Sequence, residues 1–312
     1  MCRTIESGGR RCPQHTDPVK HAAYNARRRE LYAAKKNGSL DNTPKRPPVP
    51  VDPLGEQYGF KPLTENRAPI LQYGDDSPEF KRYLEESEAF ENKLMSKISL
   101  SKTPMHIILK DYTANGFNQV RDYLNGKTFG QFEMEQQDKK YSFKERYTLK
   151  QEVKTIDKAI KLADKPKDNR IVYRGLVVPM HVKNADAGEW VKNKFPVGQI
   201  ISQKHYMSTT LDPSIALHKF SNAAGSSERK VIFEIMTKQG APLTRVSIFS
   251  EEMEVLMPRE AKFRVVSVTE NVEFKSHSKW ALAAPNPYVE PEMRTIIRLV
   301  DESAVPNSEQ KG

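Results

Sequence analysis

The chain has 312 residues, with 37% hydrophobic and 29% charged side chains, which suits one large folded domain with appendages or two modest domains. No window approaches the run of about 18 apolar residues that a transmembrane helix needs, and the first residues lack the apolar stretch of a secretory signal peptide. The net charge is +10, of which residues 1–50 supply +7, with 11 Lys or Arg against 4 Asp or Glu.

Residues 1–50 therefore form a basic arm. Both cysteines lie in it, which disfavours a disulfide-stapled fold and predicts a reducing compartment, namely the cytoplasm. Cys2, Cys12 and His15 have a spacing typical of no zinc site, so we interpret the thiols as reduced side chains on a flexible end. The alternative is a zinc site that takes His21 as its fourth ligand. We expect no metal.

The arm continues into a basic helix and a proline-rich linker. Residues 19–36 are rich in alanine and arginine, and Gly38 is a plausible stop for a helix there. Five prolines between Pro44 and Pro53 then predict a linker or an extended strap without regular helix. We place the domain boundary near residue 75, so that residues 1–75 are the arm and linker and residues 76–312 are the main folded domain. The arginines of the arm motivate one hypothesis, an association with nucleic acid through residues 1–50.

Three helical regions follow the linker. Residues 77–98 begin with a Ser-Pro pair that favours a helix start, and their apolar side chains approximate one face. Residues 105–126 read as two helical pieces around Asn115-Gly116. A third region, 143–164, sets Leu149, Val153 and Ile156 at helical spacing.

After Pro166 the pattern changes to short strands rich in β-branched residues. The predicted strands are residues 171–178, 205–211, 230–236, 254–258, 262–270 and 294–302. Helices first and strands later predict an α+β fold, with N-terminal helices packed on a mostly antiparallel sheet or on a split, mostly antiparallel β-sandwich.

Three groups of polar side chains stand out in the strand-rich half. Arg174 interrupts an apolar strand, Ser208 and Thr210 lie on one face of the next, and Glu252 and Glu254 share a face if their segment is extended. Taken singly, each is an ordinary surface or strand residue. Together they are more specific, because an arginine fork holds phosphates and a carboxylate stabilises positive charge at a breaking glycosidic bond.

In this order the motifs resemble the mono-ADP-ribosyltransferases of the arginine-serine-glutamate class, which include clostridial exoenzymes and binary toxins. The similar pieces are "LKDYTANGFNQVRDYLNG", "IDKAI" ahead of "VYRGL", "YMSTTL" and "EEMEVLMPREAKFRVVSV". They span roughly residues 100–301. Thr210 stands where the family usually has a third serine, and it keeps the hydroxyl.

The resemblance implies roles for individual residues. Glu254 would be the catalytic glutamate, Ser208 would brace it, Arg174 would bind the phosphates of NAD, and Glu252 would engage the acceptor. Phe249, five residues before Glu254, would contact the target. The implied NAD-binding residues are Arg174, Gly175, Ser208, Thr209, Phe220 and Arg229.

The resemblance also implies the activity: transfer of ADP-ribose from NAD to an arginine of a target protein. A glutamate rather than a glutamine at position 252 favours arginine as the acceptor. The alternatives are an NAD glycohydrolase, an enzyme that modifies nucleic acid, and a binding module without activity. We expect a monomer without membrane association, from a bacterial effector or a phage-encoded modifier of host proteins.

Overall fold

The computed structural model describes residues 52–61, 63, 78–97, 105–126, 148–179, 181–183, 186–216, 220, 230–274 and 292–304. The chain divides after Val49, and all of these residues belong to the unit Pro50–Gly312. The predictions for the basic arm therefore lie outside the described residues. Within the described part, no helix combines the length and the apolar character that crossing a membrane would require.

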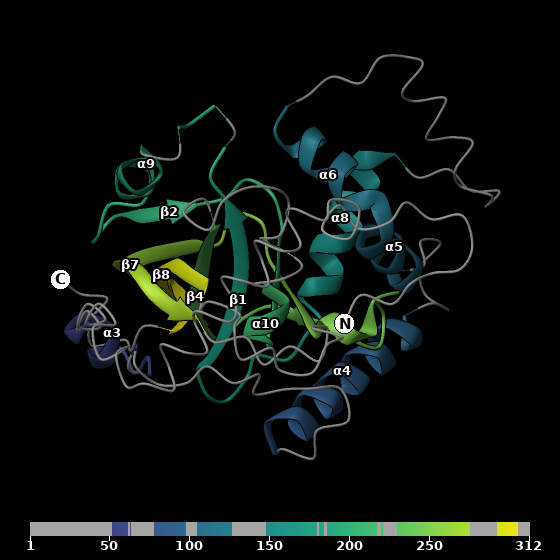
Figure 1. The fold of residues 1–312 in the computed structure, drawn as a ribbon. Helices are drawn as coiled ribbons and strands as arrows, with labels where there is room; N and C mark the ends of the chain where they lie inside the picture. Colours follow the sequence, from purple (N-terminus) through teal and green to yellow (C-terminus); the bar gives the residue numbers. More distant parts are fainter. Residues whose placement is uncertain are drawn as a thin grey trace, which may run out of the picture. The chain divides into compact units, whose positions relative to one another are not determined.

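Most of the described helices precede the first strand, and the remaining short ones lie between or after the strands (Figure 1). The described helices are α3 (Pro53–Gln57), α4 (Pro78–Ser96), α5 (Met105–Asp111), the π-helix η3 (Tyr112–Gly116), α6 (Phe117–Leu124), α8 (Leu149–Ile160), α9 (Ala187–Lys194) and α10 (Pro213–Ile215), with 3-10 turns η7 (Ser250–Glu252) and η8 (Glu302–Ala304). Local signals explain two helix starts. Pro78 is the first residue of α4, and Thr148 and Gln151 form a capping box at α8.

The described strands form one eight-stranded sheet in the order β2-β7-β8-β4-β1-β3-β6-β5. They are β1 (Arg170–Val177), β2 (Ile200–Ser202), β3 (Met207–Thr210), β4 (Lys230–Thr237), β5 (Ala241–Pro242), β6 (Glu254–Met257), β7 (Lys262–Phe274) and β8 (Glu292–Asp301). All pairs are antiparallel except β4 with β8. The pairing of β1 with β3 is limited to Tyr173 opposite Thr210, so the sheet consists of two parts with a narrow junction.

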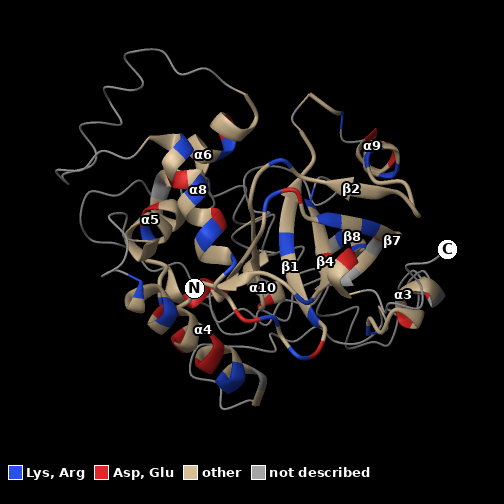
Figure 2. Cartoon of the chain, turned by 180° about the vertical axis from the view of Figure 1, so that it is seen from behind, with Lys and Arg blue, Asp and Glu red and all other residues tan. Residues whose placement is uncertain are grey.

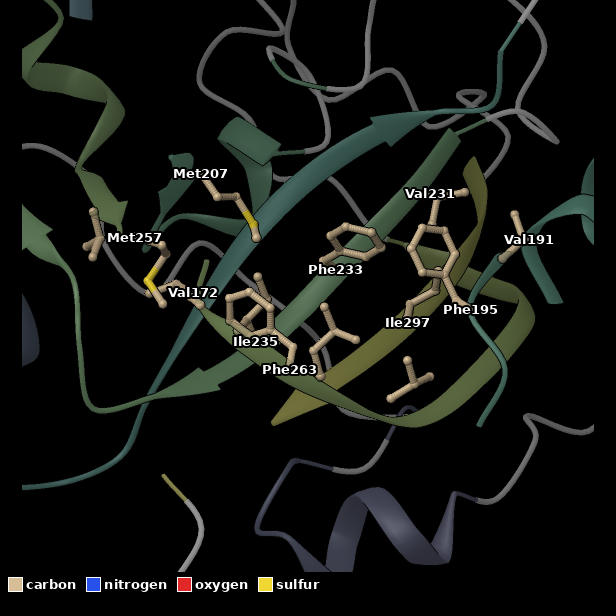
Figure 3. Close-up of a cluster of buried hydrophobic side chains, with 14 of the residues drawn as sticks. Val172, Val191, Phe195, Met207, Val231, Phe233, Ile235, Met257, Phe263 and Ile297 are labelled. Carbon is tan, nitrogen blue, oxygen red and sulfur yellow. The ribbon is translucent and has the colours of Figure 1, made fainter. Parts of the chain in front are cut away.

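The largest apolar cluster lies between these two parts. It joins Val172 of β1 and Phe233 of β4 to Met207 of β3 and Met257 of β6 (Figure 3). The opposite face of β3 and β6 packs on helices α4, α5, α6 and α8, where Tyr206 and Leu256 meet side chains such as Ile156. Successive strand residues thus face two different cores, which gives β3, β6 and β5 the inner position of a layered α+β structure. The predicted fold class is confirmed.

The predicted elements agree with the structure where apolar periodicity is strong. The structure adds α9, β2 and β5, which are short or lack such a pattern. It corrects the linker prediction in one respect, because α3 is a short helix that starts at Pro53. Proline is tolerated at the first helical position, and the side chain of Asp52 accepts a hydrogen bond from Gly55 N at 2.9 Å.

Asp52 also belongs to a buried ionic network that joins the start of α3 to strands β8 and β4. Its carboxylate accepts from Arg298 Nη1 of β8 at 2.9 Å, and Arg298 Nε donates to Glu234 of β4 at 2.9 Å. The Arg298 guanidinium lies 5.0 Å from the centre of the Phe60 ring and also donates to the Lys61 carbonyl. The described residues 52–61 thus pack on the sheet, although the domain boundary near residue 75 stays a prediction.

Candidate functional site

The candidate site lies where the two parts of the sheet meet. Strand β1 supplies Arg174, β3 supplies Ser208, and β6 begins with Glu254. The register places Ser208 opposite Leu256 and Thr210 opposite Glu254, so Ser208 and Glu254 lie on the same face of neighbouring strands. The structure therefore brings together the arginine, the serine and the glutamate that the sequence analysis singled out.

Glu254 is buried, with 3% of its surface exposed, and its surroundings determine its protonation. Burial raises the pKa of Glu254 to about 7, and the negative charge of Glu252 acts in the same direction. The hydrogen bond from Ser208 and the positive charge of Arg174 act against this rise in pKa. A carboxyl group with this pKa changes its charge close to neutral pH, as catalytic acids and bases do.

Arg174 projects from a central strand, not from an edge. Its Nη1 donates to the carbonyl oxygen of Ser208 at 2.5 Å, which ties β1 to β3 beside their short pairing. Burial lowers the pKa of Arg174, while the nearby Tyr112 and Glu254 counteract that effect. An arginine stays protonated under such conditions, so the site holds a permanent positive charge next to Glu254. Figure 2 shows that strands in the middle of the sheet carry charged residues.

The segment before Glu254 differs from the prediction. Glu252 ends the 3-10 turn η7, and Met253 has a left-handed backbone with φ 45°, so the segment is not extended. The expectation that Glu252 and Glu254 share a strand face is therefore wrong. Two contacts hold the turn in place. Thr210 Oγ1 donates to the Glu252 carbonyl at 2.6 Å, and the Met253 side chain is buried in the core. Glu252 still lies near enough to raise the pKa of Glu254.

The predicted NAD-binding residues have different environments. Gly175 is buried opposite Ile232, and Thr209 is fully buried and donates to the Val255 carbonyl at 2.6 Å. Phe220 packs against the cluster that contains Tyr173 and Ile232. Arg229 lies outside the described residues. The role of each in binding NAD stays a prediction.

The turn that precedes the glutamates carries an exposed apolar pair. Ile248 is 46% exposed and Phe249 is 37% exposed. The Phe249 backbone N–H donates to Ser247 Oγ at 3.1 Å, which shapes the turn. Exposed apolar side chains can form contacts with another protein, and the role of Phe249 in contacting a target stays a prediction.

Two tyrosines complete the site, and the sequence analysis assigned no role to either. Tyr83 of α4 donates to the Glu254 carbonyl at 2.7 Å and accepts from Thr244 at 2.7 Å. Tyr112 of η3 is hydrogen-bonded to Ser208. Burial raises the pKa of both phenols, so each stays protonated at neutral pH. Only the "YT" of the quoted helical motif pointed to Tyr112, and Tyr83 lies 171 residues from Glu254.

The hydrogen bond between Ser208 and Glu254 has a fixed direction. A carboxylate only accepts, so the Ser208 hydroxyl donates to Glu254. Ser208 also interacts with the side chain of Tyr112. The bond to Glu254 orients its carboxylate and favours its charged form. Within the described residues, no three His, Cys, Asp or Glu side chains lie together as metal ligands.

Comparisons with known proteins point to one family. Residues 82–286 match the family described as ADP-ribosyltransferase exoenzyme. A putative NAD(+)–arginine ADP-ribosyltransferase, Mav, of Mycobacterium avium (strain 104) is 34% identical over 98 residues, which is 31% of this chain but only 11% of that protein.

Two solved structures are similar at low identity. Plx2a, an ADP-ribosyltransferase toxin from Paenibacillus larvae, is 17% identical with a TM-score of 0.45, covering 70% of this chain and 96% of its own. The Vis toxin, an ADP-ribosyltransferase from Vibrio splendidus, is 20% identical with a TM-score of 0.44, covering 76% of this chain and 90% of its own.

Proposed function

Since the chain belongs to the ADP-ribosyltransferase exoenzyme family, we propose that it transfers ADP-ribose from NAD to an arginine side chain of a target protein. The observation that carries this proposal is the convergence of Arg174, Ser208 and Glu254 at the junction of the sheet, with the Ser208 hydroxyl on the Glu254 carboxylate. Three separate strands supply these groups.

The first step breaks the glycosidic bond between nicotinamide and ribose. The nicotinamide nitrogen takes the electron pair, and positive charge develops on the ribose. The Glu254 carboxylate, when charged, stabilises that charge, since Ser208 orients the carboxylate before the reaction and its charge is little screened by solvent. Arg174, whose side chain lies where β1 meets β3, holds the phosphates of NAD through its planar guanidinium.

The second step forms the bond between a guanidino nitrogen of the acceptor and the ribose carbon. A guanidinium is a poor nucleophile until it loses a proton, and a carboxylate beside it both attracts it and accepts that proton. Glu252 is the carboxylate that accepts this proton. It lies two residues before Glu254, and the hydrogen bond from Thr210 to its carbonyl holds its turn in place. The exposed Phe249 and the rest of the turn contact the target protein.

The assignment of arginine as the acceptor rests on two observations. A glutamate occupies position 252, where a negative charge suits a cationic acceptor. The relative from Mycobacterium avium is named as a putative NAD(+)–arginine enzyme, although the match covers a small part of it.

The test is incubation with NAD labelled in its adenylate and a cell lysate, followed by separation of protein, nucleic acid and free ADP-ribose. Label retained on protein and released by hydroxylamine under conditions for arginine linkage supports the proposal. Label only in free ADP-ribose indicates an NAD glycohydrolase, and label in nucleic acid indicates a different acceptor; either result contradicts transfer to arginine.

The variant Glu252→Gln separates the two steps. It should lose transfer to protein while it keeps part of the NAD hydrolysis, because Gln cannot accept the proton of the guanidinium. An equal loss of both activities would show that Glu252 does not act on the acceptor. Glu251→Gln is the matched control in the same turn, and it should retain both activities.

A further inference from the structure

Tyr206 lies one residue before β3 and outside the site described above. Its side chain is buried against α8, where its hydroxyl donates to Asp157 Oδ1 at 2.7 Å and lies 2.9 Å from the Val153 carbonyl oxygen. Burial raises the pKa of the Tyr206 phenol, so it stays protonated and keeps donating. These contacts fix the start of the strand that carries Ser208.

Arg259 holds Asp157 from the other side. Arg259 follows β6, the strand that starts with Glu254, and its Nε and Nη2 lie 3.0–3.1 Å from the two carboxylate oxygens of Asp157. A bidentate arginine–carboxylate pair fixes the relative orientation of the two side chains as well as their distance. One carboxylate of α8 therefore connects the beginning of β3 to the end of β6. We call Tyr206, Asp157 and Arg259 the α8 clamp.

The α8 clamp reaches the site through Tyr112. The rings of Tyr206 and Tyr112 meet edge to face, with centroids 5.8 Å apart and an angle of 84° between the rings. Tyr112 in turn interacts with the side chain of Ser208, which donates to Glu254. The clamp thus acts on Ser208 in two ways: through the backbone of β3 and through the Tyr112 ring.

We propose that the α8 clamp is a positioning device for the catalytic carboxylate: it holds Tyr112 and Ser208 in register with Glu254. None of its three residues belongs to the proposed catalytic or binding set. The inference rests on the proposed function, because it takes Glu254 as the group that acts on the ribose. It adds that the reactivity of Glu254 depends on an ion pair between α8 and the residue Arg259 that follows β6.

A small displacement at this position has a large effect on rate. A displacement of a catalytic group by about 1 Å lowers the reaction rate by up to about a hundredfold. When the Ser208 hydrogen bond weakens, the pKa of Glu254 rises further, since burial and the charge of Glu252 then act with less opposition. The other groups that face Glu254 are Arg174 of β1, Tyr112 of η3 and Tyr83 of α4, and the clamp variants substitute none of the three.

The experiment measures nicotinamide release from NAD against pH for wild type, Asp157→Asn and Tyr206→Phe. Asp157→Asn removes the charge that Arg259 holds, and Tyr206→Phe keeps the ring while it removes the hydroxyl. We expect kcat to fall about tenfold for Asp157→Asn. The rising limb of its kcat–pH profile should move to higher pH, in the direction that Ser208→Ala also moves it. Tyr206→Phe should show a smaller shift of the same sign.

Lys192→Gln is the control, because it breaks an exposed ion pair, Lys192 with Glu270 at 3.1 Å, on α9 and β7. It should leave both kcat and the pH profile unchanged. If the clamp variants lower the melting temperature but keep the wild-type profile, the clamp is structural only and the proposal is wrong. If Asp157→Asn does not fold, Tyr206→Phe decides between these results. Failure of the proposed function looks different, because Glu254→Gln would then keep its activity.

Discussion

At the scale of single residues, the protonation of Glu254 makes a direct prediction of pH dependence. The carboxylate must be charged to stabilise the ribose cation, and its pKa is about 7. Nicotinamide release should therefore fall as the pH drops through about 7 and reach a plateau above about 8. A kcat–pH profile checks this. A rising limb centred near pH 4.5, where an ordinary glutamate titrates, would contradict the described environment.

The same raised pKa has a consequence for stability. A carboxyl group whose pKa is higher in the folded than in the unfolded protein weakens the fold once the pH exceeds its unfolded value. We expect Glu254→Gln to be more stable than wild type at pH 8, by on the order of 3 kcal/mol, and to show little difference at pH 4. Chemical denaturation at the two pH values measures this. A variant less stable than wild type at pH 8 would refute it.

Thr210 supports a prediction about the acceptor step. Its hydroxyl donates to the Glu252 carbonyl and accepts from Asp212 N at 3.0 Å, so Thr210→Val removes the anchor of the turn but keeps the shape. Transfer to protein should fall more than NAD hydrolysis, measured as the ratio of labelled protein to released nicotinamide. Thr210→Ser keeps the hydroxyl and is the control. Equal losses in Thr210→Val would show that the turn does not serve the acceptor.

At the scale of elements, the turn between β4 and β5 is tightly constrained. Gly240 has φ 108°, and a Cβ there would lie 2.6 Å from Val255 Cγ1 of β6. Gly240→Ala should therefore destabilise the fold by roughly 1–3 kcal/mol, through backbone strain and displacement of β6. Thermal unfolding checks the value. Gly126→Ala is a useful comparison, because that glycine also has a positive φ but no atom within 4 Å of the added Cβ.

Element by element, apolar periodicity predicted the structure where a segment has a strong pattern. Helix α4 and strands β1, β4 and β6 lie within a residue or two of their expected bounds, because each has one or two buried faces. Strand β2 has three residues and β5 has two, too few to show alternation. The turn at Glu252 escaped prediction, because its shape depends on the left-handed Met253 and on Thr210 from another strand.

The sequence pointed to the polar site residues on the strands but not to the two buried tyrosines of the site. Arg174 stands out because it interrupts an apolar strand. Ser208 and Glu254 are ordinary when taken singly, and they stand out only within the ordered set of motifs that resembles a known family. Tyr83 and Tyr112 do not, because buried tyrosines are common in helices and their contacts come from distant segments. Tyr112 also depends on the π-helix η3, a rare geometry that local propensity does not encode.

At the scale of the whole molecule, the segment 52–61 tests how the catalytic domain begins. Asp52, Arg298 and Glu234 are all buried, and Ser267 Oγ donates to Asp52 at 2.5 Å. Asp52→Ala leaves the Arg298 guanidinium buried with one carboxylate fewer, which should cost about 3–5 kcal/mol of stability. Asp168→Ala, which removes an exposed partner of Arg82, should cost less than about 1 kcal/mol. Equal effects in denaturation would contradict the ionic network.

A truncation that starts at residue 64 should lose stability as Asp52→Ala does, whereas one that starts at residue 50 should be as stable as the full chain. A third truncation tests the basic arm. If removal of residues 1–45 leaves nucleic-acid binding and its salt dependence unchanged, the hypothesis for the arm is wrong.

The proposed mechanism assigns to Glu254 the stabilisation of the breaking glycosidic bond. The most direct test is the rate of nicotinamide release from NAD by Glu254→Gln, a change that keeps the size of the side chain and one acceptor oxygen but removes its charge. We predict a loss of about a hundredfold or more, with the folded state intact by circular dichroism. Release at the wild-type rate would contradict the central claim.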